Sequence, residues 1–183
     1  MSKRVLVPLA EGFEEIEAIT VIDILRRADV EVIVAGLAEG PVQGRSGIRV
    51  LPDTTLDTVQ AQDLDMIVLP GGLGGTQRLR EDPRIQSLLK ALASRGKYTT
   101  AICAAPTVLS AVGLTRGRTV TSHPSVRQEL SEVHYREDRV VVDGPVVTSR
   151  APGTAMEFAM KLVELLEGPE KVAAVNQGVL ARL

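Results

Sequence analysis

The sequence is poor in the residues on which several classes of protein depend. It has one cysteine, two histidines and no tryptophan among 183 residues, and only 2% of its residues are aromatic. A single cysteine excludes an internal disulfide framework and a cysteine-rich metal site. The scarcity of aromatic side chains argues against a surface on which nucleic-acid bases stack.

Charge and hydropathy exclude further classes. The chain has 21 Lys and Arg against 23 Asp and Glu, which gives a formal net charge of -2. It therefore lacks the positive charge that attracts nucleic acid or an anionic membrane. No apolar run approaches the ~18 residues of a membrane span, and the one after Arg4 is too short for a signal peptide. We expect a cytoplasmic protein with neither membrane nor nucleic acid as a partner.

What the chain does contain is an alternation of apolar strands and amphipathic helices. Hydrophobic residues make up 44% and charged residues 24%, enough to bury the core of one domain. No repeat, low-complexity segment or linker interrupts the pattern, so we predict one doubly wound α/β domain over residues 1–183. The predicted strands are 5–9, 30–37, 66–69, 98–102 and 118–121, with hairpins at 42–51 and 139–148. The predicted helices are 14–28, 83–95, 108–112, 155–166 and 170–180.

The cysteine lies at a predicted corner between a strand and a helix. The run 98–102 leads into Cys103, and small residues and Pro106 precede the helical pattern 108–112. A helix N-terminus offers free N–H groups and a positive dipole end, which favour an anion. We therefore expect the pKa of this thiol to lie below the ~8.5 of a free cysteine, as in a nucleophile. The alternative is an inert, buried cysteine that acts as a small apolar side chain.

A carboxylate lies on the apolar face of the first predicted helix. Helical spacing places Glu17 on the same side as Ala18, Val21 and Leu25. A buried carboxyl needs a partner or a proton, and burial raises its pKa toward that of a useful proton donor. The alternative is a carboxylate that only favours the positive end of the helix dipole.

A glycine-rich run follows the strand 66–69. The run 70–75 lacks the G-x-G-x-x-G spacing and the Gly-Lys-Ser/Thr ending of nucleotide-binding loops. It suits close approach of bare backbone, including Gly72, to a reacting centre with N–H groups aimed at an oxyanion. A flexible loop is the alternative.

One of the two histidines follows a predicted strand. The strand 118–121 ends just before His123, and α/β sites gather at the carboxyl ends of strands. We expect Glu17, Gly72, Cys103 and His123 to converge at one edge of the sheet. A cysteine and a histidine together suggest Cys–His catalysis, and a structural or solvent-facing histidine is the alternative.

Seven segments in order along essentially the whole chain match the pattern of one known family. They are 3–7, 12–17, 34–37, 69–72, 101–106, 122–124 and 148–154. Together they resemble the ThiJ/PfpI superfamily, in the branch of the Parkinson-disease-associated protein deglycase (DJ-one) and bacterial YajL. The resemblance implies a flavodoxin-like sandwich with a mostly parallel central sheet and helices on both faces. It also implies a homodimer with the helix that starts at Glu14 at its interface.

The resemblance implies roles for five residues. Cys103 matches the family's oxidation-prone nucleophile, and Glu17 matches a glutamic acid that is held protonated and hydrogen-bonds to the sulfur. Gly72 and Ala104 match residues whose backbone N–H groups form an oxyanion pocket. His123 matches a histidine near the cysteine that is not aligned as in a protease triad.

Three positions depart from related patterns. Ala104 follows the cysteine where the protease branch has histidine, so the resemblance does not imply a peptidase. Pro124 and Ser125 follow His123, so Ser125 stands where the His-x-Glu of glutaminases has its Glu, and that triad is absent. Leu73 stands where relatives often have a polar residue, which alters the expected rim of the pocket.

Residues and resemblance together predict a cofactor-free enzyme that removes small reactive dicarbonyls, of the glutathione-independent glyoxalase or protein deglycase type, in oxidative and carbonyl stress. Thiolate Cys103 would attack the aldehyde, protonated Glu17 would donate and recover a proton, and His123 would assist a proton transfer or only shape the pocket. A redox-sensing stress chaperone with an oxidisable cysteine and little turnover is the main alternative. A hydrolase or hydratase of another small substrate is a third possibility.

Overall fold

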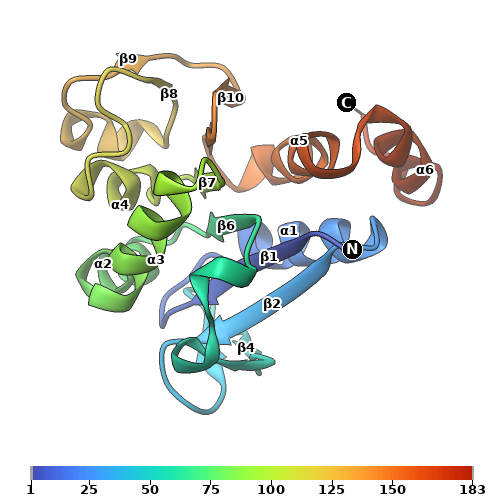
Figure 1. Ribbon diagram of the computed structural model, residues 1–183, viewed down its shortest axis with the longest axis horizontal. Helices are drawn as coiled ribbons and strands as arrows, with labels where there is room; N and C mark the ends of the chain where they lie inside the picture. The colour runs from blue at the N-terminus through green and yellow to red at the C-terminus, as the bar shows by residue number, and fades with distance from the viewer. Residues whose placement is uncertain (1, 183) are drawn as a thin grey trace.

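The computed structural model describes residues 2–182 and has a central sheet with helices on both faces (Figure 1). Its seven strands follow the order β10-β11-β7-β6-β1-β2-β5. All neighbouring pairs are parallel except β10 and β11. The predicted, mostly parallel α/β sandwich is therefore confirmed. The strands of this sheet are β1 (Arg4–Leu9), β2 (Glu31–Gly36), β5 (Thr54–Thr55), β6 (Met66–Leu69), β7 (Tyr98–Ile102), β10 (Val140–Asp143) and β11 (Val146–Ser149).

Two groups of helices cover the sheet. On one side lie α1 (Glu15–Arg27) and α5 (Ala155–Glu167), with α6 (Pro169–Val179) packed against α5 (Figure 1). On the other side lie α3 (Pro83–Ser94) and α4 (Pro106–Ala111), with α2 (Leu73–Glu81) packed against both. No helix within residues 2–182 is long and apolar enough to cross a membrane. Short 3-10 helices lie at η1 (Leu56–Thr58), η2 (Ala61–Asp63), η3 (Pro124–Glu129) and η4 (Pro152–Thr154).

Strand β1 shows why the sequence folds this way. Val5 and Val7 join the hydrophobic cluster on the α1 side, and Leu6 between them joins the cluster on the α3 side. All three are fully buried. A central parallel strand is covered on both faces, so it needs an unbroken apolar run instead of an alternating one.

Helix α2 was not predicted from the sequence. Only the first part of the glycine-rich run 70–75 is a loop: Gly72, with a φ of 87°, is the last residue before α2, which begins at Leu73. Gly74 and Gly75 lie inside this helix, where glycine is intrinsically unfavourable. A Cβ on Gly75 would lie 2.9 Å from Cα of Phe13. Glycine at this position lets the backbone of α2 pack closely on the backbone of Phe13. This packing explains why a helix forms at residues with low helix propensity.

The strand expected at 118–121 lies outside the central sheet, so that part of the prediction was wrong. β8 (Thr119–Val120) pairs instead with β9 (His134–Tyr135) in a separate parallel pair. The segment still reaches the sheet, because the backbone N–H of Thr121 donates to Oγ1 of Thr148 at 2.9 Å. Both expected hairpins are present, with β3 (Val42–Gln43) antiparallel to β4 (Arg49–Val50) and β10 antiparallel to β11.

Candidate active site

Cys103 occupies the corner between β7 and α4, and its backbone is held in an unusual conformation. Its φ of 66° lies in the left-handed region that residues other than glycine seldom adopt. Its N–H donates to the carbonyl of Ser149 at 3.0 Å, and its carbonyl accepts from the N–H of His123 at 2.8 Å. These two bonds fix the corner and leave the cysteine partly exposed at its apex.

Glu17 lies on the buried face of α1, beside the cysteine. It is fully buried, and Oε2 accepts a 2.7 Å hydrogen bond from the N–H of Gly71. A Cβ on Gly71 would lie 2.5 Å from that oxygen and 2.6 Å from Cβ of Cys103. The missing side chain of Gly71 is therefore what allows the carboxyl and the cysteine to approach. The second oxygen, Oε1, has no hydrogen-bond partner among the described residues.

Burial raises the pKa of both groups. The pKa of Glu17 rises to about 7, mainly through desolvation, which hydrogen bonds with Cys103 and Gly71 partly oppose. The pKa of Cys103 rises to about 12, first through burial and then through the charge and hydrogen bond of Glu17. The N–H groups of Gly72 and Ala104 lower the thiol pKa, as expected, but burial outweighs them. The net lowering expected from the sequence was therefore wrong.

The two groups titrate as a pair. An ionised Glu17 raises the pKa of Cys103 because it repels the thiolate, and a protonated Glu17 removes that repulsion. The thiolate is therefore favoured in the state in which the carboxyl holds the proton. The apparent pKa values belong to the pair and not to either side chain alone.

Gly72 and Ala104 bring two backbone N–H groups to the sulfur, from the loop before α2 and the turn before α4. Both N–H groups lower the pKa of the thiol, as hydrogen-bond donors close to a sulfur do. A Cβ on Gly72 would lie 2.3 Å from the carbonyl oxygen of Gly12 and 2.7 Å from the nitrogen of Glu14. With a φ of 87° as well, this position requires glycine. Two backbone donors beside one sulfur are what an oxyanion pocket would require.

His123 lies near the cysteine but is not hydrogen-bonded to its sulfur. The residue precedes η3, and its Nδ1 lies 2.7 Å from Oγ of Ser125. The N–H of Ser125 also donates to Nδ1 at 3.2 Å, so a neutral imidazole has its proton on Nε2. No hydrogen bond joins the ring to Cys103 within the described part of the chain. The structure thus brings the four predicted residues together without forming a Cys–His pair.

A pocket of about 310 Å³ opens over Cys103. It includes an ion pair that the sequence did not reveal, between Arg45 of the β3–β4 turn and buried Glu14, with 3.1 Å between guanidinium and carboxylate. These residues are far apart in the sequence and only tertiary contact joins them. The residues that line the pocket are Gly12, Glu14, Arg45, Gly72, Leu73, Gly74, Cys103, Ala104, His123, Ser125 and Pro152.

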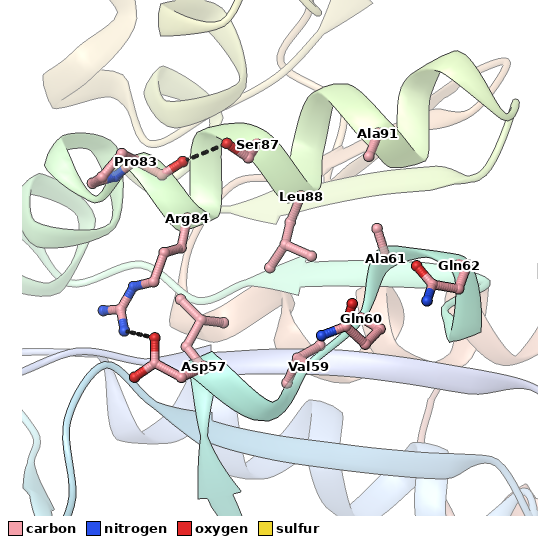
Figure 2. Close-up of a pocket in the computed structure, with 11 residues that line it drawn as sticks. Asp57, Val59, Gln60, Ala61, Gln62, Pro83, Arg84, Ser87, Leu88 and Ala91 are labelled. Atoms are coloured by element: carbon pink, nitrogen blue, oxygen red, sulfur yellow. Dashed lines mark hydrogen bonds and ion pairs between the residues drawn. The ribbon is translucent and has the colours of Figure 1, made fainter.

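A second cavity, of about 470 Å³, lies between η1, η2 and α3 (Figure 2). Its most prominent polar group, Arg84, turns toward Asp57 at 2.9 Å and is also paired with Asp82. None of the predicted site residues lines this cavity. Within residues 2–182, no three His, Cys, Asp or Glu side chains cluster as a metal site would require. The predicted site residues Gly72, Cys103, Ala104 and His123 line the pocket over the cysteine instead.

A cysteine at a sharp turn between a strand and a helix of a mostly parallel sheet is typical of α/β proteins with a nucleophile turn. The model of the DJ-1/PfpI family matches residues 3–165, and the chain belongs to that family. It is 47% identical over 183 residues to Protein dj-1beta of Drosophila melanogaster, with 98% of both chains covered. The crystal structure of Drosophila melanogaster DJ-1beta superimposes with a TM-score of 0.96 at 46% identity over 100% of both chains.

A second relative bears a functional name. The Caenorhabditis elegans protein named glutathione-independent glyoxalase DJR-1.2 is 44% identical over 172 residues, which cover 93% of this chain and 91% of that protein. The family and fold expected from the sequence are confirmed by these similarities. The enzyme class expected from the sequence agrees with this relative's name.

Proposed function

We propose that this protein is a cofactor-free glyoxalase that converts small 2-oxoaldehydes to 2-hydroxycarboxylates through Cys103. The observation on which the proposal depends is the buried Glu17 carboxyl beside the cysteine, bound by Gly71. Its pKa of about 7 suits a group that both accepts and donates a proton near neutral pH. The similarity to the worm glyoxalase supports the same chemistry.

The first step is addition of Cys103 to the aldehyde. The thiol proton passes to Glu17, the sulfur bonds to the aldehyde carbon, and the carbonyl π electrons move to oxygen. The N–H groups of Gly72 and Ala104 stabilise that oxyanion until protonated Glu17 neutralises it. The product is a hemithioacetal, which contains all the atoms of the substrate and the thiol and no others.

The second step rearranges the carbon skeleton. A proton leaves the former aldehyde carbon and another reaches the neighbouring carbon, so an enediol becomes a thioester without net oxidation. We assign this proton transfer to Glu17, because its carboxyl and Cys103 approach each other across the missing side chain of Gly71. Water then hydrolyses the thioester to lactate from methylglyoxal, or glycolate from glyoxal, and releases the thiol. In the deglycase form of the reaction, the sulfur of Cys103 bonds to the carbinol carbon of an amine adduct of the same aldehyde, the C–N bond breaks, and the amine leaves with the thiol proton; the same hemithioacetal results.

The decisive experiment measures lactate formed from methylglyoxal without glutathione, by wild type and by Cys103→Ser. Intact mass establishes that the wild-type thiol is reduced. We expect clear turnover by the wild type and none by the variant, because serine is a far weaker nucleophile. Equal, near-background rates from fully reduced wild type and variant would reject the proposal.

A redox sensor is the second candidate, and the same corner favours it. Cys103 is partly exposed beside an acid that can donate to an oxidised sulfur. Selective oxidation of Cys103 to sulfinate by modest peroxide, combined with negligible turnover of methylglyoxal, would favour the sensor over the enzyme.

We also propose that the protein works as a cytoplasmic homodimer, with α1 at the interface. Ile16 and Ile19 on α1 are 56% and 42% exposed, and Ile48 in the β3–β4 turn is 57% exposed. Oε1 of Glu15 joins the two elements by accepting from the N–H of Ile48 at 3.3 Å. This α1–hairpin surface, made of Ile16, Ile19 and Ile48, is an apolar patch that a second copy would cover.

A further inference from the structure

Arg45 is held in place by the hairpin tip on which it lies. Its N–H donates to the carbonyl of Phe13 at 2.9 Å, and the neighbouring N–H of Ser46 donates to Oε1 of Glu15 at 2.7 Å. A Cβ on Gly44 would lie 2.3 Å from Cδ of Glu15, so the turn packs directly on that carboxylate. These contacts fix the backbone of Arg45 against the start of α1, beside the pocket over the cysteine.

Most N–H groups of the Arg45 guanidinium are available to a ligand. The Arg45 side chain is 63% exposed, and within residues 2–182 it makes one side-chain hydrogen bond, from a terminal nitrogen to Oε2 of Glu14, whose side chain is 7% exposed. Four of the five N–H groups of an arginine remain for a ligand. Arg45 is the one Lys or Arg among the described residues that line the pocket. Its fork-shaped group matches a carboxylate, and Glu14 is already neutralised by the pair.

We propose that Arg45 is a specificity-determining residue that binds the carboxylate of small acids whose carbonyl or hydroxyl carbon lies at Cys103. The inference rests on the proposed function, because the reaction ends in a 2-hydroxycarboxylate inside this pocket. It adds a substrate and ligand class: aldehydes that already contain a carboxylate, of which glyoxylate is the smallest. Leu73, 69% exposed on the rim, provides no charge for that role.

Glyoxylate makes the inference testable, because its reaction should stop at the adduct. The thiol adds to the aldehyde carbon, and the thiol proton ends on the carbonyl oxygen, which gives a hemithioacetal. The adjacent carbon is a carboxylate without a ketone carbonyl to accept electrons, so no enediol rearrangement follows. Glyoxylate should therefore be a reversible ligand of Cys103 and a competitor of methylglyoxal.

The experiment measures the dissociation constants of glyoxylate and of its uncharged analogue glyoxylamide by isothermal titration calorimetry. Wild type is compared with Arg45→Gln, and with Arg49→Gln as the matched control. Arg49 lies on the same hairpin and bonds to Gln43, outside the pocket. Turnover of methylglyoxal is measured on the same samples, so that failure of the glyoxalase proposal shows separately from failure of carboxylate binding.

We expect Arg45→Gln to raise the dissociation constant of glyoxylate about tenfold, because a partly exposed charge-assisted hydrogen bond is lost. The same substitution should change the dissociation constant of glyoxylamide less than twofold. Arg49→Gln should leave the dissociation constants of both ligands unchanged. The double variant Glu14→Gln/Arg45→Gln tests whether the loss is only repulsion by an unpaired Glu14. Three results would overturn the proposal. The double variant could recover glyoxylate binding, Arg45→Gln could weaken the binding of glyoxylate and glyoxylamide equally, or Arg45→Gln could bind glyoxylate as tightly as wild type does.

Discussion

The N–H of Gly71 donates a 2.7 Å hydrogen bond to Oε2 of Glu17, and this bond joins the buried acid of α1 to the end of β6. It fixes one carboxyl oxygen and leaves the other without a partner in the described structure. A neutral carboxyl accepts this bond on one oxygen and keeps its proton on the other.

The raised pKa of Glu17 predicts a pH-dependent stability. Between pH 4.5 and about 7 the folded protein binds more protons than the unfolded chain, so the contribution of Glu17 to stability falls as pH rises. Glu17→Gln removes this dependence. The free energy of unfolding of the variant, relative to wild type, should increase by about 3 kcal/mol from pH 4.5 to pH 8.5.

Urea unfolding at a series of pH values measures this difference. Glu39→Gln is the control, because Glu39 is exposed on a loop, and its difference from wild type should be small throughout. A Glu17→Gln difference that stays constant from pH 4.5 to 8.5 would show that burial does not raise the pKa of this acid.

Gly71→Ala should damage stability and activity together. The new Cβ would lie 2.5 Å from Oε2 of Glu17 and 2.6 Å from Cβ of Cys103, and both side chains would have to move. We expect a loss of about 1–3 kcal/mol in stability, as in other overpacked sites, and at least about a tenfold loss in kcat/KM for methylglyoxal. Gly178→Ala is the control: its Cβ would meet only Arg27 at 3.9 Å, and it should stabilise α6 slightly. Wild-type kcat/KM in Gly71→Ala would contradict the proposed arrangement.

His123→Ala should reduce kcat for methylglyoxal less than tenfold. The imidazole is hydrogen-bonded to Ser125 through Nδ1 and makes no hydrogen bond to the sulfur in residues 2–182. Removal of a true general acid or base typically costs about 10²–10⁴. Steady-state kinetics on His123→Ala and Ser125→Ala give the comparison. A hundredfold fall in kcat with unchanged KM in His123→Ala alone would assign the histidine a direct proton transfer.

Ile16→Asp should dissociate the proposed dimer. Ile16 lies in the α1–hairpin surface, and a buried, unpaired charge there would oppose association. Light scattering coupled to size-exclusion chromatography should give the mass of one chain for the variant and of two for wild type. Val142→Asp is the control, because Val142 is 44% exposed on strand β10, outside that surface. A dimeric Ile16→Asp would place the interface elsewhere.

Much of the fold follows from local pattern. The unbroken apolar run of β1 and the helical spacing in α1 and α3 predict the layers, because burial on one or both faces imposes a period on the sequence. Local pattern does not predict helix α2, because glycines disfavour a helix in isolation. Gly75 is required only once the backbone of Phe13 packs against it.

By itself the sequence determined the doubly wound α/β class, the corner at Cys103 and an acid on the buried face of α1, since each depends on residues close together in the chain. The resemblance of seven segments added the family. Tertiary structure decided the raised thiol pKa, the bond between Glu17 and Gly71, and the Glu14–Arg45 pair. Desolvation and pairing depend on which distant segments enclose a group, and a local pattern does not contain that information.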